Sequence, residues 1–404
     1  MAVGAKMSNT IFTPANIFKA YLDCRKTKRQ TINALKYELN LESNLARLQQ
    51  ELATKTYYPS RSICFVVTTP KPREIFAAEF NDRIVHHILI NQVQHIWEKR
   101  IFIPNSYACR KSKGHHYGVS HVLQFAKQFA FYGQFDIANF FSSIDKDILY
   151  DCFSRVILKA HKPNFWKEEI LWLAKTIIFH DPTQNFYYKG NPRLIQLVPF
   201  GKSLFDQNEK TGLPIGNLTS QFFANVYLNE LDQYITKTLR CLAYGRYVDD
   251  FLLFSDTKEE ILRWRNAISI FLASNLHLLL HPRKQQIQTT RHGIPFVGYF
   301  IKPWGITVRR NVVKNIKSRL YVNNKRENFE YLVRSVNSYF GHLRKAKTNR
   351  LRQHLIEKHL SPEIKSQIKV VGNWKYLRLK KKRPSLIKNS PKYQKFKKPN
   401  SRCA

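Results

Sequence analysis

The chain has 404 residues, which is too long for one compact hydrophobic core and favours two or three subdomains that share interfaces. Its 67 Lys and Arg against 28 Asp and Glu give a formal net charge of +39, which favours a nucleic-acid partner, with a ribosome-associated or membrane-surface protein as the alternatives. The six cysteines form no CxxC pair or zinc-spaced cluster, so we expect them to be reduced. The sequence shows neither a signal peptide nor a run of about 18 apolar residues, so we expect a cytoplasmic protein without a membrane partner.

The N-terminal part of the chain changes from helical to strand patterning. Residues 30–56 place apolar side chains at helical spacing, and Ser43 is the expected N-cap of a helix within this range. The β-branched and aromatic run 61–69 breaks at Pro70-Lys71-Pro72 and resumes at residues 73–75. This pattern predicts a β-hairpin.

The centre of the chain alternates predicted strands and helices. In chain order we expect a helix at 82–97, a basic glycine-containing segment at 107–118, a strand at 131–137, and helices at 145–158 and 167–179. Turn-forming residues then predict an inserted hairpin or loop at 181–212. The elements expected beyond it are a helix at 218–238, strands flanking 247–250, a helix at 259–276 and strands around 285–308.

The C-terminal part is basic throughout. Residues 311–369 show helical patterning with little strand signal. From Lys375 onward Lys, Arg and Pro are frequent and Asp and Glu are absent. We expect this tail to be disordered until it meets RNA.

The segment AYGRYVDDFLLFS, residues 243–255, places two adjacent acids between apolar runs. Successive side chains of a strand point to opposite faces, so Asp249 and Asp250 can converge only where the strand turns. An exposed Asx turn is the alternative interpretation of an isolated Asp pair. The flanking apolar runs favour a buried hairpin tip, where two unpaired carboxylates are costly without cations.

A third acid, Asp136, ends the apolar strand of YGQFDIANFFSSID. Capping of the following helix is the alternative role, but Ser142, Ser143 and Asp145 are better placed to cap that helix. Phosphoryl transfer needs an aligned attacking oxygen and screening of phosphate charge, which two cations about 4 Å apart provide. Mg²⁺ prefers oxygen ligands, so Asp136 and the Asp pair together predict a site for two Mg²⁺ ions.

Several sequence blocks resemble, in the same order, the motifs of reverse transcriptases of the bacterial retron and group II intron-like type. FDIANFFSSID resembles the first catalytic motif, and YVDD resembles the signature motif. GLPIGNLTSQFFANVYLNELD, which lies between them, resembles the third palm motif. The remaining blocks are PKPREIFAAEFNDRIVHH for the fingers, IPNSYACRKSKGHH for the nucleotide- and template-contacting block, LLLHPRKQQ for the fourth palm motif and GIPFVGYFI for the primer grip.

The resemblance implies an α/β (α+β) fold of the right-hand polymerase type, with fingers, a palm of antiparallel sheet and helices, and a helical thumb. The implied parts are an N-terminal helical segment at 1–58, fingers at 59–130, palm at 131–308 with an insertion at 181–212, thumb at 309–370 and a basic tail at 371–404. No RNase H or HNH-type constellation follows the thumb in the sequence, so we expect other molecules to remove the template and integrate the DNA.

The resemblance also implies roles for single residues. The implied catalytic residues are Asp136, Asp249, Asp250 and Lys284, and the implied metal ligands are Asp136, Ile137, Asp249 and Asp250. Phe141 would exclude a 2′-hydroxyl, and Phe140 is expected to be an ordinary core residue. The positions expected to contact the incoming nucleotide are Lys71, Arg73, Arg83, Arg110, Phe141, Ile215, Gly216 and Tyr247. The positions expected to contact nucleic acid are Gln221, Gly298, Arg344, Lys345 and Lys347.

Two positions depart from the family pattern. Ile215 stands where the family usually has the Gln of PQG, and Gln221 stands where it has the Pro of Ser-Pro. Because Ile offers only packing to the incoming pair, low fidelity is expected. The IGxxxSQ form resembles the enzymes of diversity-generating retroelements, which copy a template RNA with errors at adenines. It also resembles unclassified bacterial enzymes, including antiphage defence systems that copy a noncoding RNA.

The sequence therefore predicts an RNA-directed DNA polymerase that copies a dedicated structured RNA in a diversity-generating retroelement, or alternatively in antiphage defence. A catalytically silent RNA-binding scaffold is the minor alternative, and a maturase-like splicing helper would need a further RNA-binding domain. The expected cofactor is a pair of Mg²⁺ ions. The expected partners are template RNA, cDNA and dNTPs, together with an accessory protein or a second copy of the chain.

Overall fold

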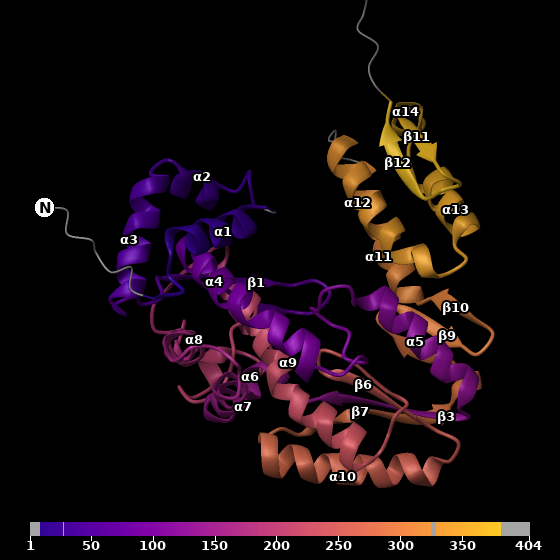
Figure 1. Ribbon diagram of the computed structural model, residues 1–404. Coiled ribbons are helices and arrows are strands. Elements are labelled where there is room, and N and C mark those ends of the chain that lie inside the picture. Colours follow the sequence, from indigo (N-terminus) through magenta and orange to yellow (C-terminus); the bar gives the residue numbers. More distant parts are fainter. Residues whose placement is uncertain (1–8, 27, 325–328, 381–404) are drawn as a thin grey trace, which may run out of the picture. The chain divides into compact units, whose positions relative to one another are not determined.

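A computed structural model describes residues 9–26, 28–324 and 329–380. The chain divides into two compact units, Met1–Ile306 and Thr307–Ala404, each with its own hydrophobic core. Figure 1 shows the helices and strands of both units. The two units are described separately below.

Three helices form the N-terminal layer of the first unit: α1 (Pro14–Arg25), α2 (Ile32–Glu38) and α3 (Leu41–Ala53). Thr13 caps α1 because its hydroxyl accepts a hydrogen bond from the backbone N–H of Asn16, and Pro14 fits the first helical position. The expectation for Ser43 was wrong, since α3 begins at Leu41 and places Ser43 inside its first turn. The helical spacing in this region was confirmed.

The predicted hairpin is present as β1 (Ser62–Val67) and β2 (Arg73–Ala77), which pair antiparallel. A third strand, β4 (Phe186–Tyr188), pairs parallel with β1 and comes from the turn-rich segment 181–212. The rest of that segment forms two short 3₁₀ helices, Pro192–Leu197 and Leu204–Asp206. The segment is therefore a loop that extends the sheet with one strand, and it forms no hairpin of its own.

A four-stranded antiparallel sheet forms the centre of the first unit, in the order β5-β6-β3-β7. The strands are β3 (Phe131–Ile137), β5 (Tyr244–Tyr247), β6 (Asp250–Ser255) and β7 (Leu280–Thr289). The helices are α4 (Phe80–Ile96), α5 (His115–Gln128), α6 (Phe140–Ser143), α7 (Lys146–Leu158), α8 (Asn164–Phe179), α9 (Leu218–Gln233) and α10 (Lys258–Leu276). Short π-helices, Trp97–Ile101 and Tyr234–Thr238, extend α4 and α9.

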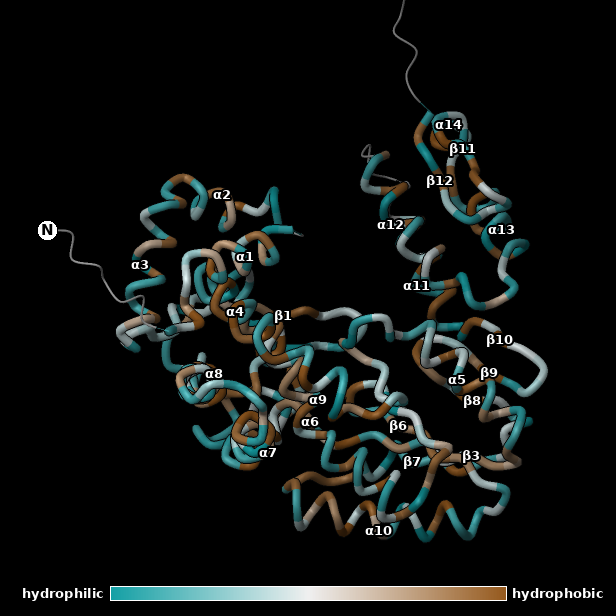
Figure 2. The backbone as a smooth tube through the Cα atoms, viewed as in Figure 1, coloured by the Kyte–Doolittle hydropathy of each residue, from teal (hydrophilic) through white to brown (hydrophobic). Residues whose placement is uncertain are grey.

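Helices pack on the central sheet and on one another. Helix α10 packs on β3, β6 and β7, while α9 packs against α4 and α7. Hydrophobic residues colour much of α4 brown in Figure 2, and most residues of α9 are buried. Between these layers Trp97 stacks on Phe153 at a centroid distance of 5.0 Å. Asp145 caps α7 through the N–H groups of Asp147 and Ile148, as its position in the sequence predicted.

A small sheet lies beyond β7 in the chain: β8 (Ile294–Phe296), β9 (Tyr299–Lys302) and β10 (Gly305–Val308). Strands β8 and β9 join through a two-residue turn in which Val297 has a φ of 38° and Gly298 a φ of 88°. Two successive positive φ values are typical of a tight hairpin turn, and they explain a glycine at the second position.

The second unit is mainly helical, with α11 (Arg310–Asn324), α12 (Phe329–His342), α13 (Asn349–His359) and α14 (Pro362–Gln367). It ends in an unexpected hairpin of β11 (Ile368–Val371) and β12 (Tyr376–Leu379). Asn337 holds β12 to α12, because its amide donates to Leu377 O at 2.9 Å and its oxygen accepts from Leu377 N at 2.7 Å. Disorder was therefore the wrong expectation for the start of the basic tail. The expectation for residues 381–404 falls outside the described residues.

Among the described residues, no helix combines the length and apolar character needed to cross a membrane.

Candidate active site

The two adjacent acids lie at a tight hairpin turn between β5 and β6. Tyr247 pairs with Asp250, so Val248 and Asp249 are the two turn residues. Val248 has a φ of 60°, which is unfavourable for a β-branched side chain and characteristic of the first position of a two-residue hairpin turn. Such a conformation costs about 1–3 kcal/mol and persists only where surrounding contacts hold it.

The contact that holds this turn is made by the buried guanidinium of Arg246. Its Nη1 donates to Val248 O at 2.9 Å and to Asn225 Oδ1 at 3.2 Å. Its Nη2 donates to Ser106 Oγ at 3.0 Å and to Asp232 Oδ2 at 2.6 Å, while Nε donates to Asp232 Oδ1 at 2.7 Å. All five N–H groups of the guanidinium thus have acceptors, which is the condition for burying such a charge without a large penalty.

The third acid faces this turn across the sheet. Strand β3 pairs with β6 so that Asp136 lies opposite Asp250, and Ile137 N donates to Asp249 O at 3.3 Å. The register therefore brings Asp136, Asp249 and Asp250 to one edge of the sheet, although Asp136 is more than one hundred positions earlier in the chain.

The electrostatics of this cluster favour cations. Burial raises the pKa of Asp250 to about 7; hydrogen bonds from Gln134 oppose this rise, and the charges of Asp249 and Asp136 add to it. Burial, followed by the charge of Asp136, also raises the pKa of Asp249. Ionised carboxylates crowded in this way repel one another, and a bound divalent cation relieves that repulsion.

Two polar side chains already engage the carboxylates. Lys284 Nζ lies 2.8 and 2.9 Å from the two oxygens of Asp136, and Gln134 Nε2 lies 3.0 and 3.1 Å from those of Asp250. Within the described ranges, no group of three or more His, Cys, Asp and Glu side chains has the arrangement of a preformed metal site. The oxygen donors and their excess negative charge nevertheless fit Mg²⁺, and Lys284 neutralises part of that charge through its ion pair with Asp136.

The segment after Asp136 carries the two adjacent phenylalanines. Phe140 is 2% exposed and belongs to the core, as expected. Phe141 is half-buried, and its carbonyl accepts from Leu213 N at 2.7 Å, which fixes the backbone from which its ring projects. Asn139 has a φ of 47°, so the chain bends sharply between the end of β3 and α6.

The loop before α9 crosses the end of β2. Ile215 O accepts from Phe76 N at 3.0 Å, and the Ile215 side chain is half-buried. Gly216 has a φ of 127°, and a Cβ there would lie 2.9 Å from Ile75 Cγ2 and 3.2 Å from Phe76 O. The positive φ and the close approach of the β2 backbone both require glycine at this position.

Other residues singled out from the sequence lie in varied surroundings. Lys71 and Arg73 are exposed on the β1-β2 hairpin, and Gln221 is exposed in the first turn of α9. The Tyr247 ring packs edge-on against Phe296 at 6.3 Å. The three expected thumb contacts are exposed and belong to the second unit: Arg344, Lys345 and Lys347.

Two arginines are engaged by the protein itself. The Arg110 side chain is 3% exposed and forms an ion pair with Glu98 at 2.9 Å. It also donates to the carbonyls of Ile103 and Ser106, so its donors are not available to a nucleotide in this structure. Arg83 Nε donates to Ala78 O at 2.7 Å.

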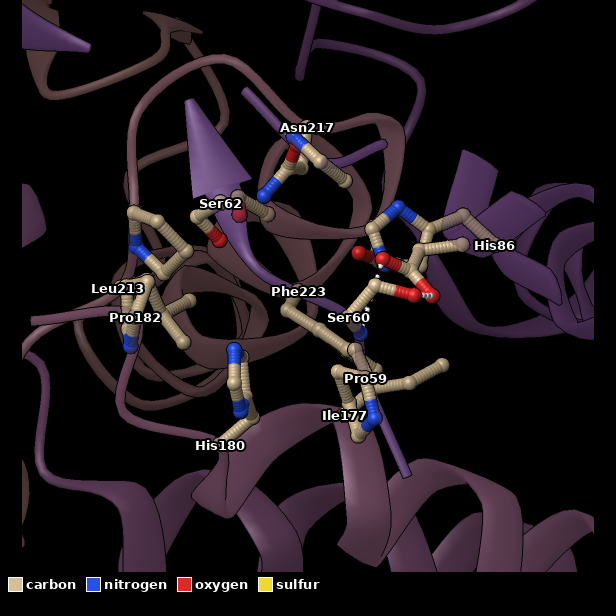
Figure 3. A pocket seen from close by; sticks show the side chains of 15 residues that line it. Pro59, Ser60, Ser62, His86, Ile177, His180, Pro182, Leu213, Asn217 and Phe223 are labelled. Carbon is tan, nitrogen blue, oxygen red and sulfur yellow. Dashed lines mark hydrogen bonds between the residues drawn. The ribbon is translucent and has the colours of Figure 1, made fainter. Parts of the chain in front are cut away.

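A small cavity lies beside Leu213 and Asn217 of the loop before α9 (Figure 3). Its lining includes Ser60, Asp82, His86, His180 and Asn217. Its volume of about 20 Å³ is enough for about one water molecule and far too small for a nucleotide. This cavity is therefore not a nucleotide site.

Sequence reasoning missed Arg246, Asp232, Gln134 and Lys202, all of which have a place in or beside this cluster. Arg246 carried a visible signal, because it is a charged residue inside the apolar strand of AYGRYVDD. Lys202 carried none, since it lies in a turn-rich segment with many other polar residues.

A family model described as reverse transcriptase (RNA-dependent DNA polymerase) matches residues 67–301. This span is more than half of the chain, and the chain belongs to this family, whose members are nucleotidyltransferases. The predicted mixed fold of helices and antiparallel sheet, which fits a right-hand polymerase, is confirmed.

Among solved structures, the chain is similar to apo telomerase from Candida tropicalis truncated from its C-terminal domain. The sequence identity is 12% and the TM-score is 0.46, and the superposition covers 65% of this chain and 59% of the telomerase chain. The chain is also similar to telomerase from Candida albicans in complex with a TWJ fragment of telomeric RNA, with 12% identity and a TM-score of 0.46, covering 80% and 58%. The chain thus spans less than two thirds of these relatives. The curated protein sequences contain no match to it.

Removal of the buried guanidinium is expected to destabilise the first unit. Arg246→Met should lower the free energy of unfolding by about 3–5 kcal/mol, because Asp232 would stay buried without its charge partner. Arg155→Met is the matched control, since Arg155 is 50% exposed in its ion pairs and should cost about 1 kcal/mol or less.

Urea unfolding followed by circular dichroism measures both variants. The double variant Arg246→Met/Asp232→Leu should lose less stability than the sum of its two single variants. Equal losses for Arg246→Met and Arg155→Met would contradict a supporting role for the buried pair.

Proposed function

We propose that the protein is an RNA-directed DNA polymerase that makes cDNA from a dedicated structured RNA by two-metal nucleotidyl transfer. The observation that carries the proposal is the convergence of Asp136, Asp249 and Asp250 at one sheet edge, within the span that matches the family. The formal net charge of +39 suits a polyanionic template and product.

We assign roles in the reaction to the residues at the sheet edge that carries the three acids. Asp136, the carbonyl of Ile137, Asp249 and Asp250 would hold two Mg²⁺ ions, which, when bound, supply charge screening and alignment of the attacking 3′-oxygen. Lys284 would move from its ion pair with Asp136 to the pyrophosphate leaving group.

The β1-β2 hairpin and the loop before α9 would form the rest of the nucleotide site. Lys71 and Arg73 are exposed cations and would bind the triphosphate of the incoming dNTP. Phe141 would lie under the sugar and exclude a 2′-hydroxyl, while Ile215 and Gly216 would pack against the sugar and the base pair. Arg83, Tyr247, Gln221 and Gly298 remain proposed contacts.

For the larger parts we propose the boundaries that the sequence resemblance implies: fingers at 59–130, palm at 131–308 and thumb at 309–370. The basic second unit would follow the backbone of the template and primer, with Arg344, Lys345 and Lys347 as contacts. The IGxxxSQ form of residues 215–221, which span the loop before α9 and its first turn, favours a diversity-generating role, and antiphage defence with a noncoding RNA is the second candidate.

Substitution of the Asp pair tests the proposal against the scaffold alternative. Asp249→Ala/Asp250→Ala should reduce cDNA synthesis to an undetectable level and leave RNA affinity nearly unchanged, because the pair acts in chemistry and not in template binding. Primer extension and filter binding measure the two properties. Asp147→Ala, which removes an exposed carboxylate on α7, is the control and should retain both. Persistent cDNA synthesis in the double variant would refute the mechanism.

Substitution of the ring beside Asp136 tests sugar selection. Phe141→Ala should raise rNTP incorporation relative to dNTP incorporation by roughly 10- to 100-fold, since loss of a single steric block is worth that range of discrimination. Phe141→Tyr keeps a ring and should keep the selection. Single-nucleotide extension with each nucleotide class gives the ratio, and an unchanged ratio in Phe141→Ala would remove the assignment.

Restoration of the family's Gln tests the proposed cause of low fidelity. Ile215→Gln should lower misincorporation by about fivefold, which corresponds to one added neutral hydrogen bond to the incoming pair. Ile215→Leu keeps an apolar side chain and should leave the error spectrum unchanged. Sequencing of cDNA from a defined template compares the three proteins, and identical error spectra would show that Ile215 does not set fidelity.

A further inference from the structure

We call the sheet edge that carries Asp136, Asp249 and Asp250 the carboxylate edge. The inserted segment 181–212 reaches this edge through a short loop, residues 201–207, which we call the insertion loop. Ser142 Oγ, in α6 just after Asp136, donates to Gly201 O at 2.7 Å. A Cβ on Gly201 would lie 3.0 Å from Asn139 Nδ2, and Gly201 itself has a φ of 76°. One end of the insertion loop is therefore fixed against the turn that follows Asp136.

The next residues of the insertion loop are fixed to β2. Ser203 Oγ donates to Glu74 Oε2, and Leu204 N donates to Glu74 Oε1 at 3.0 Å. Glu74 is 5% exposed and follows Arg73 directly in the chain. Phe205 packs on Phe76 of the same strand at 5.7 Å. The insertion loop thus joins the end of β3, which carries Asp136, to the start of β2, which carries Arg73.

Lys202 lies between these two anchors. Its neighbour Gly201 is held by the turn after Asp136, and its neighbour Ser203 is held by the residue after Arg73. The Lys202 side chain is exposed. Its backbone position is therefore set on both sides, between the segments that carry Asp136 and Arg73, while its side chain stays exposed.

The electrostatics around Lys202 indicate which charge a ligand there would carry. Partial desolvation of the largely exposed Lys202 side chain lowers its pKa, the positive charges of Lys284, Lys71 and Arg73 lower it further, and Asp136 opposes the shift. Lys202 and the three cations that act on it, Lys284, Lys71 and Arg73, come from three separate segments of the chain. Asp136 is the anion that acts on Lys202. Clustered cations of this kind repel one another and favour a polyanion with several closely spaced charges.

We propose that Lys202 binds the phosphates of the incoming dNTP, so that the insertion loop forms a third wall of the nucleotide site beside the β1-β2 hairpin and the carboxylate edge. This inference rests on the proposed polymerase function and adds a substrate contact from a segment outside the family's motif blocks. An ammonium is a compact point charge suited to phosphate oxygens, and because the backbone on both sides of Lys202 is already held, binding has to order only the side chain.

The experiment compares Lys202→Ala and Lys202→Arg with Lys210→Ala, which removes an exposed lysine from the same insertion. Primer extension should show a KM for dNTP about tenfold higher in Lys202→Ala, since a hydrogen bond to a charged group is lost. Lys202→Arg should restore most of the affinity, and Lys210→Ala should match the wild type. An equal KM in Lys202→Ala and Lys210→Ala would overturn the proposal.

A second measurement separates this proposal from the polymerase proposal. Binding of inorganic triphosphate to each protein, measured by calorimetry without template or primer, should be weakened in Lys202→Ala and unchanged in Lys210→Ala. If the wild type extends no primer but shows this difference, the polymerase proposal fails and the phosphate site remains. If triphosphate binds all variants equally while the wild type extends primers, the Lys202 contact fails and the polymerase proposal remains.

Discussion

The ion pair between Arg246 and Asp232 is the interaction on which the candidate active site depends most. Arg246 connects the turn at Val248 to α9 through Asp232 and Asn225, and to the segment before α5 through Ser106. A charge this deeply buried is tolerable only when every donor has an acceptor, so displacement of one partner disturbs the others. The strained turn and the position of Asp249 therefore depend on groups that lie outside the three-carboxylate cluster.

The same network explains why a second arginine is buried nearby. Arg110, paired with Glu98, donates to Ser106 O, and the Ser106 hydroxyl accepts from Arg246. The two guanidiniums thus fix one stretch of backbone from both sides. Tyr244 completes the arrangement, because its hydroxyl donates to Asp232 Oδ1 at 2.7 Å. The basic block before α5 accordingly serves partly as internal support, although its charge suggested nucleic-acid contacts.

Groups of opposite charge lie close together at the candidate active site. Burial and mutual repulsion raise the pKa values of Asp249 and Asp250, while Lys284 neutralises Asp136 directly. Beside them, Lys71, Arg73 and Lys284 act together on Lys202, and Asp136 is the anion that opposes their effect. An arrangement with excess negative charge beside excess positive charge suits a ligand made of divalent cations and a polyphosphate together, because each component relieves one imbalance.

Local patterns in the sequence were sufficient for much of this fold. The β1-β2 hairpin, the capping of α7 by Asp145 and the central strands follow from residues close together in the chain, so periodicity and turn chemistry predicted them. Strand β12 was missed because it lies within the Lys- and Arg-rich run that begins at Lys375 and resembles a disordered tail, and because it is held by Asn337 from a distant helix. Lys202 was missed for the same reason, since the contacts that place it come from Ser142 and Glu74.

Primer extension by the purified protein on a defined RNA template, as a function of Mg²⁺ concentration, tests the central claim most directly. The account predicts that a DNA primer is extended only when both dNTPs and Mg²⁺ are present, with activity rising from none as the metal is added. A protein that binds the template and primer tightly but extends no primer at any concentration of Mg²⁺ or Mn²⁺ would contradict it.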